Sequence, residues 1–203
     1  IASVNDAFAD QLASALSDQL SEEMYIIGPD LPVPIKCDLA PETITGVDRL
    51  LNAAAAFDVL QQACIVVDAG TAVTVDFIDG EGTFHGGAIA PGASMQLQSL
   101  HEHTESLPEL DFTAPDADAF GRSTTQAMLQ GVHFGIRGLV RILAEQYAEH
   151  CGAYPTVIVT GGDAETLFRS DELIDRIVPD LTLQGIAVTA RHAMTTANDE
   201  SND

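Results

Sequence analysis

The fold is decided by residues 63–92, which read ACIVVDAGTAVTVDFIDGEGTFHGGAIAPG. This stretch is rich in β-branched residues, is punctuated by glycine and contains the hairpin turn pair Asp79-Gly80. The pattern predicts three strands, at residues 64–68, 72–78 and 83–89, and Pro91-Gly92 ends the unit.

Helical periodicity flanks these strands on both sides. An uninterrupted run rich in alanine and leucine predicts a helix from Thr45 or Gly46 to the end of VDRLLNAAAAFDVLQQ. Another helix begins at residue 93, and a long one follows Ser123 or Thr124, either of which is a suitable N-cap. Three glycines inside the long helix are expected to permit close helix packing: Gly131, Gly135 and Gly138.

The outer segments complete an α/β pattern. Ile1 to Val4 predict a strand end that runs into an amphipathic helix, FADQLASALSDQL at residues 8–20. MYII before Gly28 predicts a strand. Residues 156–170 predict a strand, a glycine turn and a helix. The acidic residues 193–203 are expected to be a disordered tail.

Composition restricts the function classes. The chain has 203 residues, 46% of them hydrophobic, so it can form a sizeable core. A net charge of −23 argues against binding a nucleic-acid backbone or an anionic membrane surface. The one lysine, Lys36, lies in no G-x-x-x-x-G-K-[ST] string, so a P-loop is excluded. Three cysteines without a C-x-x-C motif indicate reduced thiols in a cytoplasm.

The turn DAGTA at residues 68–72 can carry phosphate chemistry. A strand delivers Asp68 to the turn, Gly70 permits close backbone approach, and the amides and hydroxyl near Thr71 can hold phosphate oxygens. Asp68 can hold a cation that neutralises those oxygens. An ordinary hairpin with a capped turn explains these residues equally well.

Three further motifs each have a chemical and a plain structural interpretation. In GVDR, residues 46–49, Asp48 can orient a hydroxyl or accept its proton, or it can simply favour the start of a helix. Gly161 and Gly162 of VTGGDA can pack against a nucleotide or can form a common strand-to-helix turn. Thr124 of GRSTTQA can bind a polar substrate or cap a helix.

In order along the chain, GVDRLLNAAAAF, DAGTAVTVD, FHGGAIAPG, GRSTTQAMLQG and VIVTGGDAETL resemble type III pantothenate kinases. The resemblance extends over nearly all of the chain except the acidic tail. It implies an α/β, ribonuclease-H-like (actin-like ATPase) fold of two lobes, usually assembled as a homodimer. Residues 1–62 would then be the C-terminal part of an incomplete first lobe, and residues 63–192 the second lobe.

The resemblance also implies roles for particular residues. Asp48 would be the catalytic aspartate, and Asp68 would bind a monovalent cation, potassium or ammonium. The implied pantothenate contacts are Gly46, Val47, Asp48 and Arg49, with Thr124 contributed by the neighbouring subunit. The resemblance adds Thr71 as an ATP contact, beside the turns at Gly70 and at Gly161-Gly162.

The implied activity is ATP- and Mg²⁺-dependent phosphorylation of the primary hydroxyl of pantothenate, the first step toward coenzyme A. Two departures stand out: the D-x-G-N-T phosphate motif of the family is not found, and Leu39 stands where many members carry tyrosine. Two alternatives therefore remain open. One is a non-catalytic accessory protein that binds nucleotide or pantothenate, and the other is a different small-molecule kinase of the same superfamily.

Overall fold

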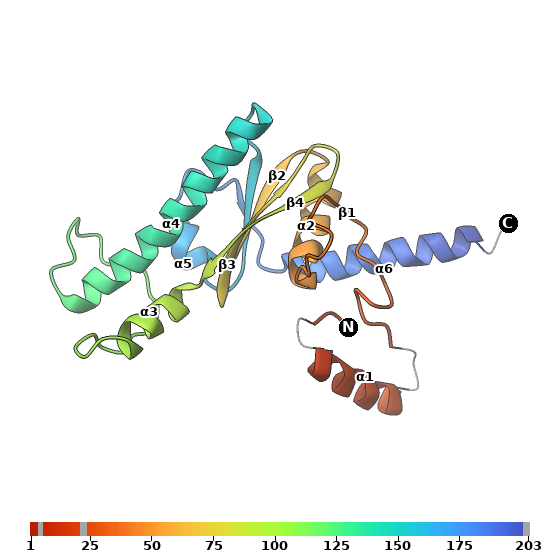
Figure 1. Ribbon diagram of the computed structural model, residues 1–203, viewed down its shortest axis with the longest axis horizontal. Coiled ribbons are helices and arrows are strands. Elements are labelled where there is room, and N and C mark those ends of the chain that lie inside the picture. Colours follow the sequence, from red (N-terminus) through yellow and green to blue (C-terminus); the bar gives the residue numbers. More distant parts are fainter. Residues whose placement is uncertain (4–5, 21–23, 201–203) are drawn as a thin grey trace. The chain divides into compact units, whose positions relative to one another are not determined.

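The computed structural model describes residues 1–3, 6–20 and 24–200 (Figure 1). Its contacts divide the chain into two compact units. Unit 1 comprises Ile1–Ala63, Ile78–Gly86 and Asp180–Asp203, and unit 2 comprises Cys64–Phe77 and Gly87–Pro179. The grouping of residues 78–86 and 180–203 with the start of the chain differs from the predicted division at residues 62 and 192. The lobe boundaries themselves stay a prediction.

The strands follow the predicted central pattern closely. The three central strands expected from the sequence are β2 (Cys64–Ala69), β3 (Ala72–Ile78) and β4 (Thr83–Pro91). The strand expected at the start of residues 156–170 is β5 (Thr156–Thr160). Two short strands were not expected, β1 (Lys36–Cys37) and β6 (Arg176–Ile177). Strand pairing runs in the order β1-β4-β3-β2-β5-β6, and the pairs β1–β4, β2–β5 and β5–β6 are parallel. The α/β class is confirmed.

The strand predicted before Gly28 is wrong. Only an isolated bridge joins Ile27 to Leu31. Gly28 has a φ of +109°. The backbone N–H of Asp30 donates a hydrogen bond to Ile26 O (2.9 Å), and the carboxylate of Asp30 accepts one from the backbone N–H of Ile26 (2.7 Å). The N–H and C=O groups of Ile26 are therefore hydrogen-bonded within the tight turn and cannot pair with a neighbouring strand.

The helices are α1 (Asp6–Leu20), α2 (Val47–Leu60), α3 (Ala93–Glu102), α4 (Thr124–Cys151), α5 (Ala164–Phe168) and α6 (Leu181–Glu200). Residues 193–200 continue α6, where the sequence indicated a disordered tail, and residues 201–203 lie outside the described residues. No helix in the described part of the chain combines the length and the apolar character of a membrane span.

In unit 1, α2 and α6 pack closely, side by side (Figure 1). The alanines at positions 53–56 of α2 are buried, and small side chains let the helix axes approach. At Gly185 of α6, a Cβ atom would lie 2.3 Å from the carbonyl oxygen of Leu51. Thr182 donates a hydrogen bond of 2.7 Å to buried Asn52, so the contact also pairs polar groups.

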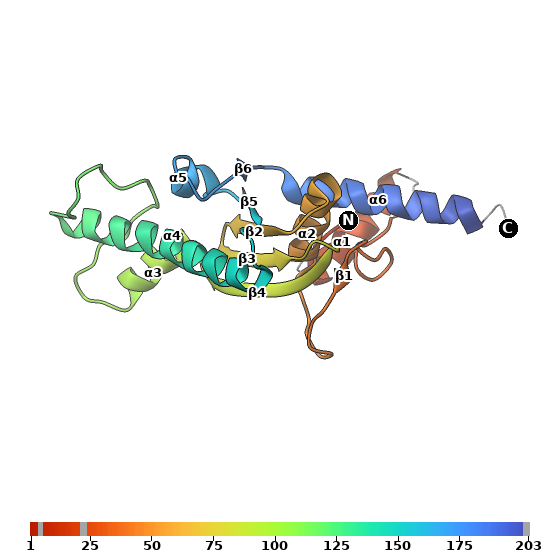
Figure 2. The ribbon, with the colours of Figure 1, turned by 90° about the horizontal axis from the view of Figure 1, so that it is seen from above.

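In unit 2, β2 and β5 are buried strands of the parallel type. Residues 64–67 and 157–160 are buried throughout, as expected for strands covered on both faces. Helices α4 and α5 lie on one side of the unit 2 strands (Figure 2). Helix α4 is unbroken, and no atom lies within 4 Å of a Cβ added at any of its three interior glycines. The expectation that these glycines serve close packing within the chain is therefore wrong.

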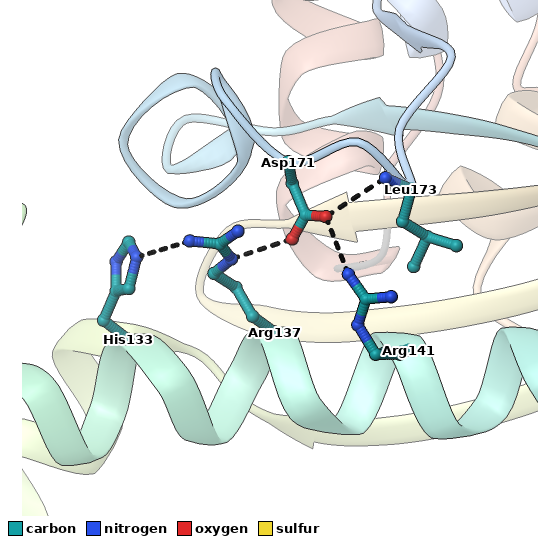
Figure 3. A network of polar contacts seen from close by, with 5 residues as sticks. All are labelled: His133, Arg137, Arg141, Asp171 and Leu173. Carbon is teal, nitrogen blue, oxygen red and sulfur yellow. Dashed lines mark hydrogen bonds and ion pairs between the residues drawn. The ribbon is translucent and has the colours of Figure 1, made fainter.

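A buried carboxylate joins α4 to the segment after α5 (Figure 3). The side chain of Asp171 is 4% exposed and accepts hydrogen bonds from Arg137 Nε (2.8 Å) and Arg141 (3.2 Å) of α4. Leu173 N–H also donates to it (3.1 Å). Burial by itself raises the pKa of Asp171, but the bonds from Leu173 and Arg137 and the two guanidinium charges outweigh burial and hold the pKa below its ordinary value.

We predict that Asp171→Asn lowers the free energy of unfolding by about 1–3 kcal/mol at neutral pH, because it leaves Arg137 without its ionic partner. Since the folded-state pKa is depressed, the contribution of Asp171 is present above the unfolded-state pKa and is lost as the pH falls through the folded-state value. Urea titrations of both proteins at several pH values check this.

The exposed pair Glu165–Arg169 provides the control, because its side chains are 53% and 80% exposed. Glu165→Gln should change the free energy of unfolding by less than about 0.5 kcal/mol. Equal stability of Asp171→Asn and the parent protein at neutral pH would contradict the assigned role.

Candidate functional site

The GVDR motif lies at the start of α2 in unit 1. Gly46 is the N-cap residue, with extended backbone angles, and contributes no side-chain cap. Asp48, in the first turn and half-buried, accepts a hydrogen bond of 2.9 Å from the backbone N–H of Arg49. Carboxylates are stabilised at the N-terminal end of a helix. The bond from Arg49 N–H therefore agrees with the interpretation that Asp48 favours the start of α2. It also fixes a half-exposed carboxylate at a rigid helix start, which suits a positioned base.

Arg49 is oriented by an aromatic ring. Its guanidinium carbon lies 5.6 Å from the centroid of Phe84, a fully buried ring of β4. Leu39, at the position where the family often has tyrosine, lies close to the β4 turn: a Cβ at Gly86 would meet its side chain at 3.1 Å. Leu39 therefore has a packing role here and offers no hydroxyl to a substrate.

Thr45 is a residue that the motif analysis did not single out as chemical. Its hydroxyl is buried and has no hydrogen-bond partner among the described residues, directly before the GVDR motif. Buried hydroxyls are nearly always paired. The sequence signal was weak, because a threonine before a helix is ordinarily an N-cap.

In unit 2, Asp68 and two glycine turns are brought together. Asp68 stands opposite Thr160 in the parallel pair β2–β5, so the ends of both strands lie side by side. Gly161 follows at once with a φ of +98°, and a Cβ there would lie 2.4 Å from Ala69 O and 2.6 Å from Asp68 Oδ1. Only glycine permits this approach of backbone to carboxylate.

A third glycine turn packs on the loop that contains Thr71. Gly92, just before α3, donates its N–H to Thr71 O (3.0 Å), and a Cβ at Gly92 would lie 2.1 Å from Gly70 O. Gly70 in turn donates to Ala72 O at 3.0 Å. Thr71 itself is exposed, so solvent can reach its hydroxyl group.

The turn after β5 is tied back to β2. Asp163 N–H donates to Ala69 O at 2.9 Å, and burial raises the pKa of the Asp163 carboxyl. Gly162 is exposed, and a Cβ there would meet no atom within 4 Å. Thus Gly161 is required by packing, whereas Gly162 leaves open space beside the turn.

Thr124 is the first residue of α4, and its neighbour makes the cap. Ser123 Oγ accepts the hydrogen bond from Gln126 N–H (3.2 Å), which leaves Thr124 exposed at the helix start. Thr124 lines a mostly apolar cavity of about 670 Å³ between α3, α4 and the loop that joins them. Thr124 therefore does not cap α4; its side chain lines the wall of this cavity.

The predicted residues fall into three local groups. Unit 1 contains the consecutive residues Gly46, Val47, Asp48 and Arg49. Unit 2 brings together the predicted ATP and cation residues Asp68, Gly70, Thr71, Gly161 and Gly162, and it places Thr124 in a separate cavity. Within unit 2, residues more than 90 positions apart in the sequence thus meet at one sheet end.

We predict that Gly161→Ala lowers the free energy of unfolding by about 1–3 kcal/mol, because it combines backbone strain with a clash against Ala69 O. Gly162→Ala is the matched comparison, and it should change the stability by less than about 1 kcal/mol because its methyl group enters open space. Thermal unfolding of both variants measures the difference in stability. Equal stability of the two variants would contradict the close approach at Gly161.

Comparisons with known proteins agree on one family. A family model described as type III pantothenate kinase matches residues 1–146. A protein of that name from Dehalococcoides mccartyi is 38% identical over 161 residues, which cover 79% of this chain and 61% of the relative. One from Akkermansia muciniphila is 36% identical over 180 residues, covering 89% and 74%. This chain thus spans about three fifths of the length of the Dehalococcoides relative.

A solved structure from Campylobacter jejuni, described as a conserved Baf family transcriptional activator, has a TM-score of 0.66 and 23% identity. It covers 95% of this chain, and 81% of that chain is covered in return. At this identity the likeness concerns the fold alone, and it agrees with the α/β class expected from the sequence. Since the family model covers well over half of the residues and the identities of the relatives exceed one third, the chain belongs to the type III pantothenate kinase family.

Proposed function

We propose that this chain is part of an enzyme that transfers the γ-phosphoryl group of ATP to the primary hydroxyl of pantothenate. The products are 4′-phosphopantothenate and ADP, and the reaction begins the route to coenzyme A. The observation that carries the proposal is the family match over residues 1–146, which includes GVDR at the start of α2 and DAGTA at the end of β2.

Asp48 is the proposed base. Its carboxylate orients the primary hydroxyl and takes up the proton as the oxygen attacks the γ-phosphorus and the bond to the β-phosphate oxygen breaks. Arg49, aligned by its contact with Phe84, offers a planar set of donors for the carboxylate of pantothenate. The buried hydroxyl of Thr45 next to the motif supports a polar ligand here.

The nucleotide is assigned to the glycine turns of unit 2. Exposed Thr71 and the open space beside Gly162 suit phosphate oxygens and the nucleoside, and the backbone N–H groups of such turns favour anions. Phosphoryl transfer needs the attacking hydroxyl in line with the γ-phosphorus and its leaving oxygen. Catalysis is then positioning and charge stabilisation.

We assign a monovalent cation, potassium or ammonium, to Asp68. Its Oδ1 atom and the carbonyl oxygen of Ala69 both lie beside the turn at Gly161, and hard cations prefer oxygen ligands. Within residues 1–3, 6–20 and 24–200, no group of three His, Cys, Asp or Glu side chains could hold a metal ion. We therefore assign Mg²⁺ mainly to the ATP phosphates, where it neutralises their charge.

We further propose a homodimer in the cytoplasm. Thr124 lines its own cavity at the start of α4, a place from which a side chain can serve a substrate bound to a neighbouring subunit. The exposed apolar residues Met95, Phe134 and Ile142 of α3 and α4 support an interface of this unit with a second copy.

A coupled ADP-release assay on the protein that carries this chain tests the proposal, with pantothenate, acetate and a hexose as acceptors. We predict turnover with pantothenate only, and a loss of kcat of about 10²–10⁴-fold in Asp48→Asn, which keeps the shape of the side chain but cannot accept the proton. Turnover with a sugar or acetate and none with pantothenate would reject the substrate.

The control variant is Asp58→Asn, on the same helix, which removes an exposed ion pair with Arg191. It should keep normal turnover. ATP binding without turnover in the parent protein would favour the non-catalytic alternative, and parent-like rates in Asp48→Asn would reject Asp48 as the base.

The cation assignment makes a separate prediction. Replacing potassium by sodium should reduce turnover and weaken ATP binding, because the cation proposed at Asp68 neutralises phosphate oxygens and the two ions differ in size and hydration. Asp68→Asn should abolish the difference between the two ions. The apparent KM for ATP in each salt is the measurement, and indifference of the parent protein to the ion would contradict the site.

A further inference from the structure

His133 of α4 is a buried polar side chain that the proposed reaction does not use. The residue is 7% exposed, and its Nε2 atom lies 3.3 Å from a terminal nitrogen of Arg137 (Figure 3). Its Nδ1 atom is buried and has no hydrogen-bond partner among the described residues. One ring nitrogen thus faces a cationic group and the other is buried without an acceptor, so neither is placed to stabilise a positive charge on the ring.

The partner of Nε2 fixes the tautomer. A guanidinium group can only donate hydrogen bonds, so Nε2 must be the acceptor and the ring must carry its hydrogen on Nδ1. Protonation of Nε2 would place an N–H against the guanidinium, which is itself held by Asp171 through Arg137 Nε. The arrangement accommodates neutral His133 and opposes the imidazolium form.

The same ring holds the loop that joins α3 to α4. Phe112 of that loop stacks on His133, with centroids 6.5 Å apart and planes at 28°, and Phe134 meets the ring edge-on at 5.1 Å. The loop also contacts α4 elsewhere: Gln130 donates to Asp118 O, Asp116 N–H donates to Gln126, and Gly121 packs on the backbone of Ala127. The stack on His133 is thus an aromatic contact of the loop with a buried side chain.

The charges that act on His133 come from two segments. Burial and the Arg137 charge on α4 lower its pKa, and Asp171, in the segment after α5, acts in the opposite direction without reversing the shift. His101 lies in the same part of unit 2 and bonds Leu107 O through Nδ1 at 2.8 Å. This bond ties the loop to α3 and does not involve His133.

We propose that His133 is a pH-sensitive anchor: its neutral ring holds Phe112 and the loop of residues 104–123 on α4, and its protonation in mild acid releases that loop. The direction follows from linkage. Phe112 covers the ring only in the docked state, so docking adds burial that disfavours the charged ring, whereas Arg137 acts on the ring in both states. Docking is therefore complete above the ordinary histidine pKa of about 6.5 and weakens as the pH falls below it. Leu107 of this loop lines the cavity that contains Thr124, so release would alter that cavity.

Hydrogen–deuterium exchange of the loop peptides in the intact protein tests the anchor, with rates corrected by an unstructured reference peptide at each pH. In the parent protein, protection should fall by up to about tenfold between about pH 7.5 and about pH 5.5, the limit for uptake of one proton on opening. His133→Gln, whose amide oxygen can still accept from Arg137, should show no such pH dependence.

His101→Gln is the matched control and should keep the pH response of the parent protein. Unchanged protection in the parent protein, or the same pH response in His133→Gln, would overturn the proposal. An NMR titration of the parent protein gives a reading without any variant: the Phe112 ring resonances should titrate together with the His133 ring. A Phe112 signal that does not follow His133 would also overturn it.

Discussion

The contact between Gly161 and the end of β2 is the constraint on which the glycine turns of unit 2, the proposed nucleotide site, depend. Because β2 and β5 are parallel neighbours in register, Asp68 and Thr160 reach the same end of the sheet. The next residue must then pass within van der Waals distance of Ala69 O and the Asp68 carboxylate, and only a residue without Cβ can do so. A short turn thereby brings an anion-binding backbone beside a carboxylate, the arrangement that a phosphate with its counter-cation requires.

In unit 1, small side chains allow α2 and α6 to pack closely. A run of buried alanines lets α6 approach α2 until Gly185 touches the carbonyl of Leu51. This packing holds α2, whose first turn contains Asp48, so the proposed base is carried by a rigid element.

Unit 2 also contains a polar cluster that the reaction does not explain. Asp171 is held by two arginines from α4, and one of these arginines contacts His133. In such a chain of contacts the charge of each member depends on the others, because burial penalises every unpaired charge. The cluster stabilises the segment after α5 and also makes the loop contact at Phe112 sensitive to protonation.

The local pattern of the sequence determined the three central strands, the start of α2 and the α/β class. Period-2 β-branched runs and an uninterrupted alanine-leucine run act over a few residues and compete with little else. It failed where tertiary context decided the outcome: Gly28 turned a predicted strand into a tight turn, and α6 continued through the acidic residues 193–200. The glycines of α4 face open space within this chain, which no periodicity could reveal.

The candidate residues divide in the same way. Order along the chain sufficed to single out GVDR, DAGTA and VTGGDA, because each motif is a strand end or a helix start with recognisable residue types. Only the tertiary structure distinguished Gly161 from Gly162, gave the cap to Ser123 and not Thr124, and brought Asp171 to Arg137 and His133. Those facts depend on which backbone passes within a few ångströms of which side chain, and such distances between residues remote in sequence are set by packing.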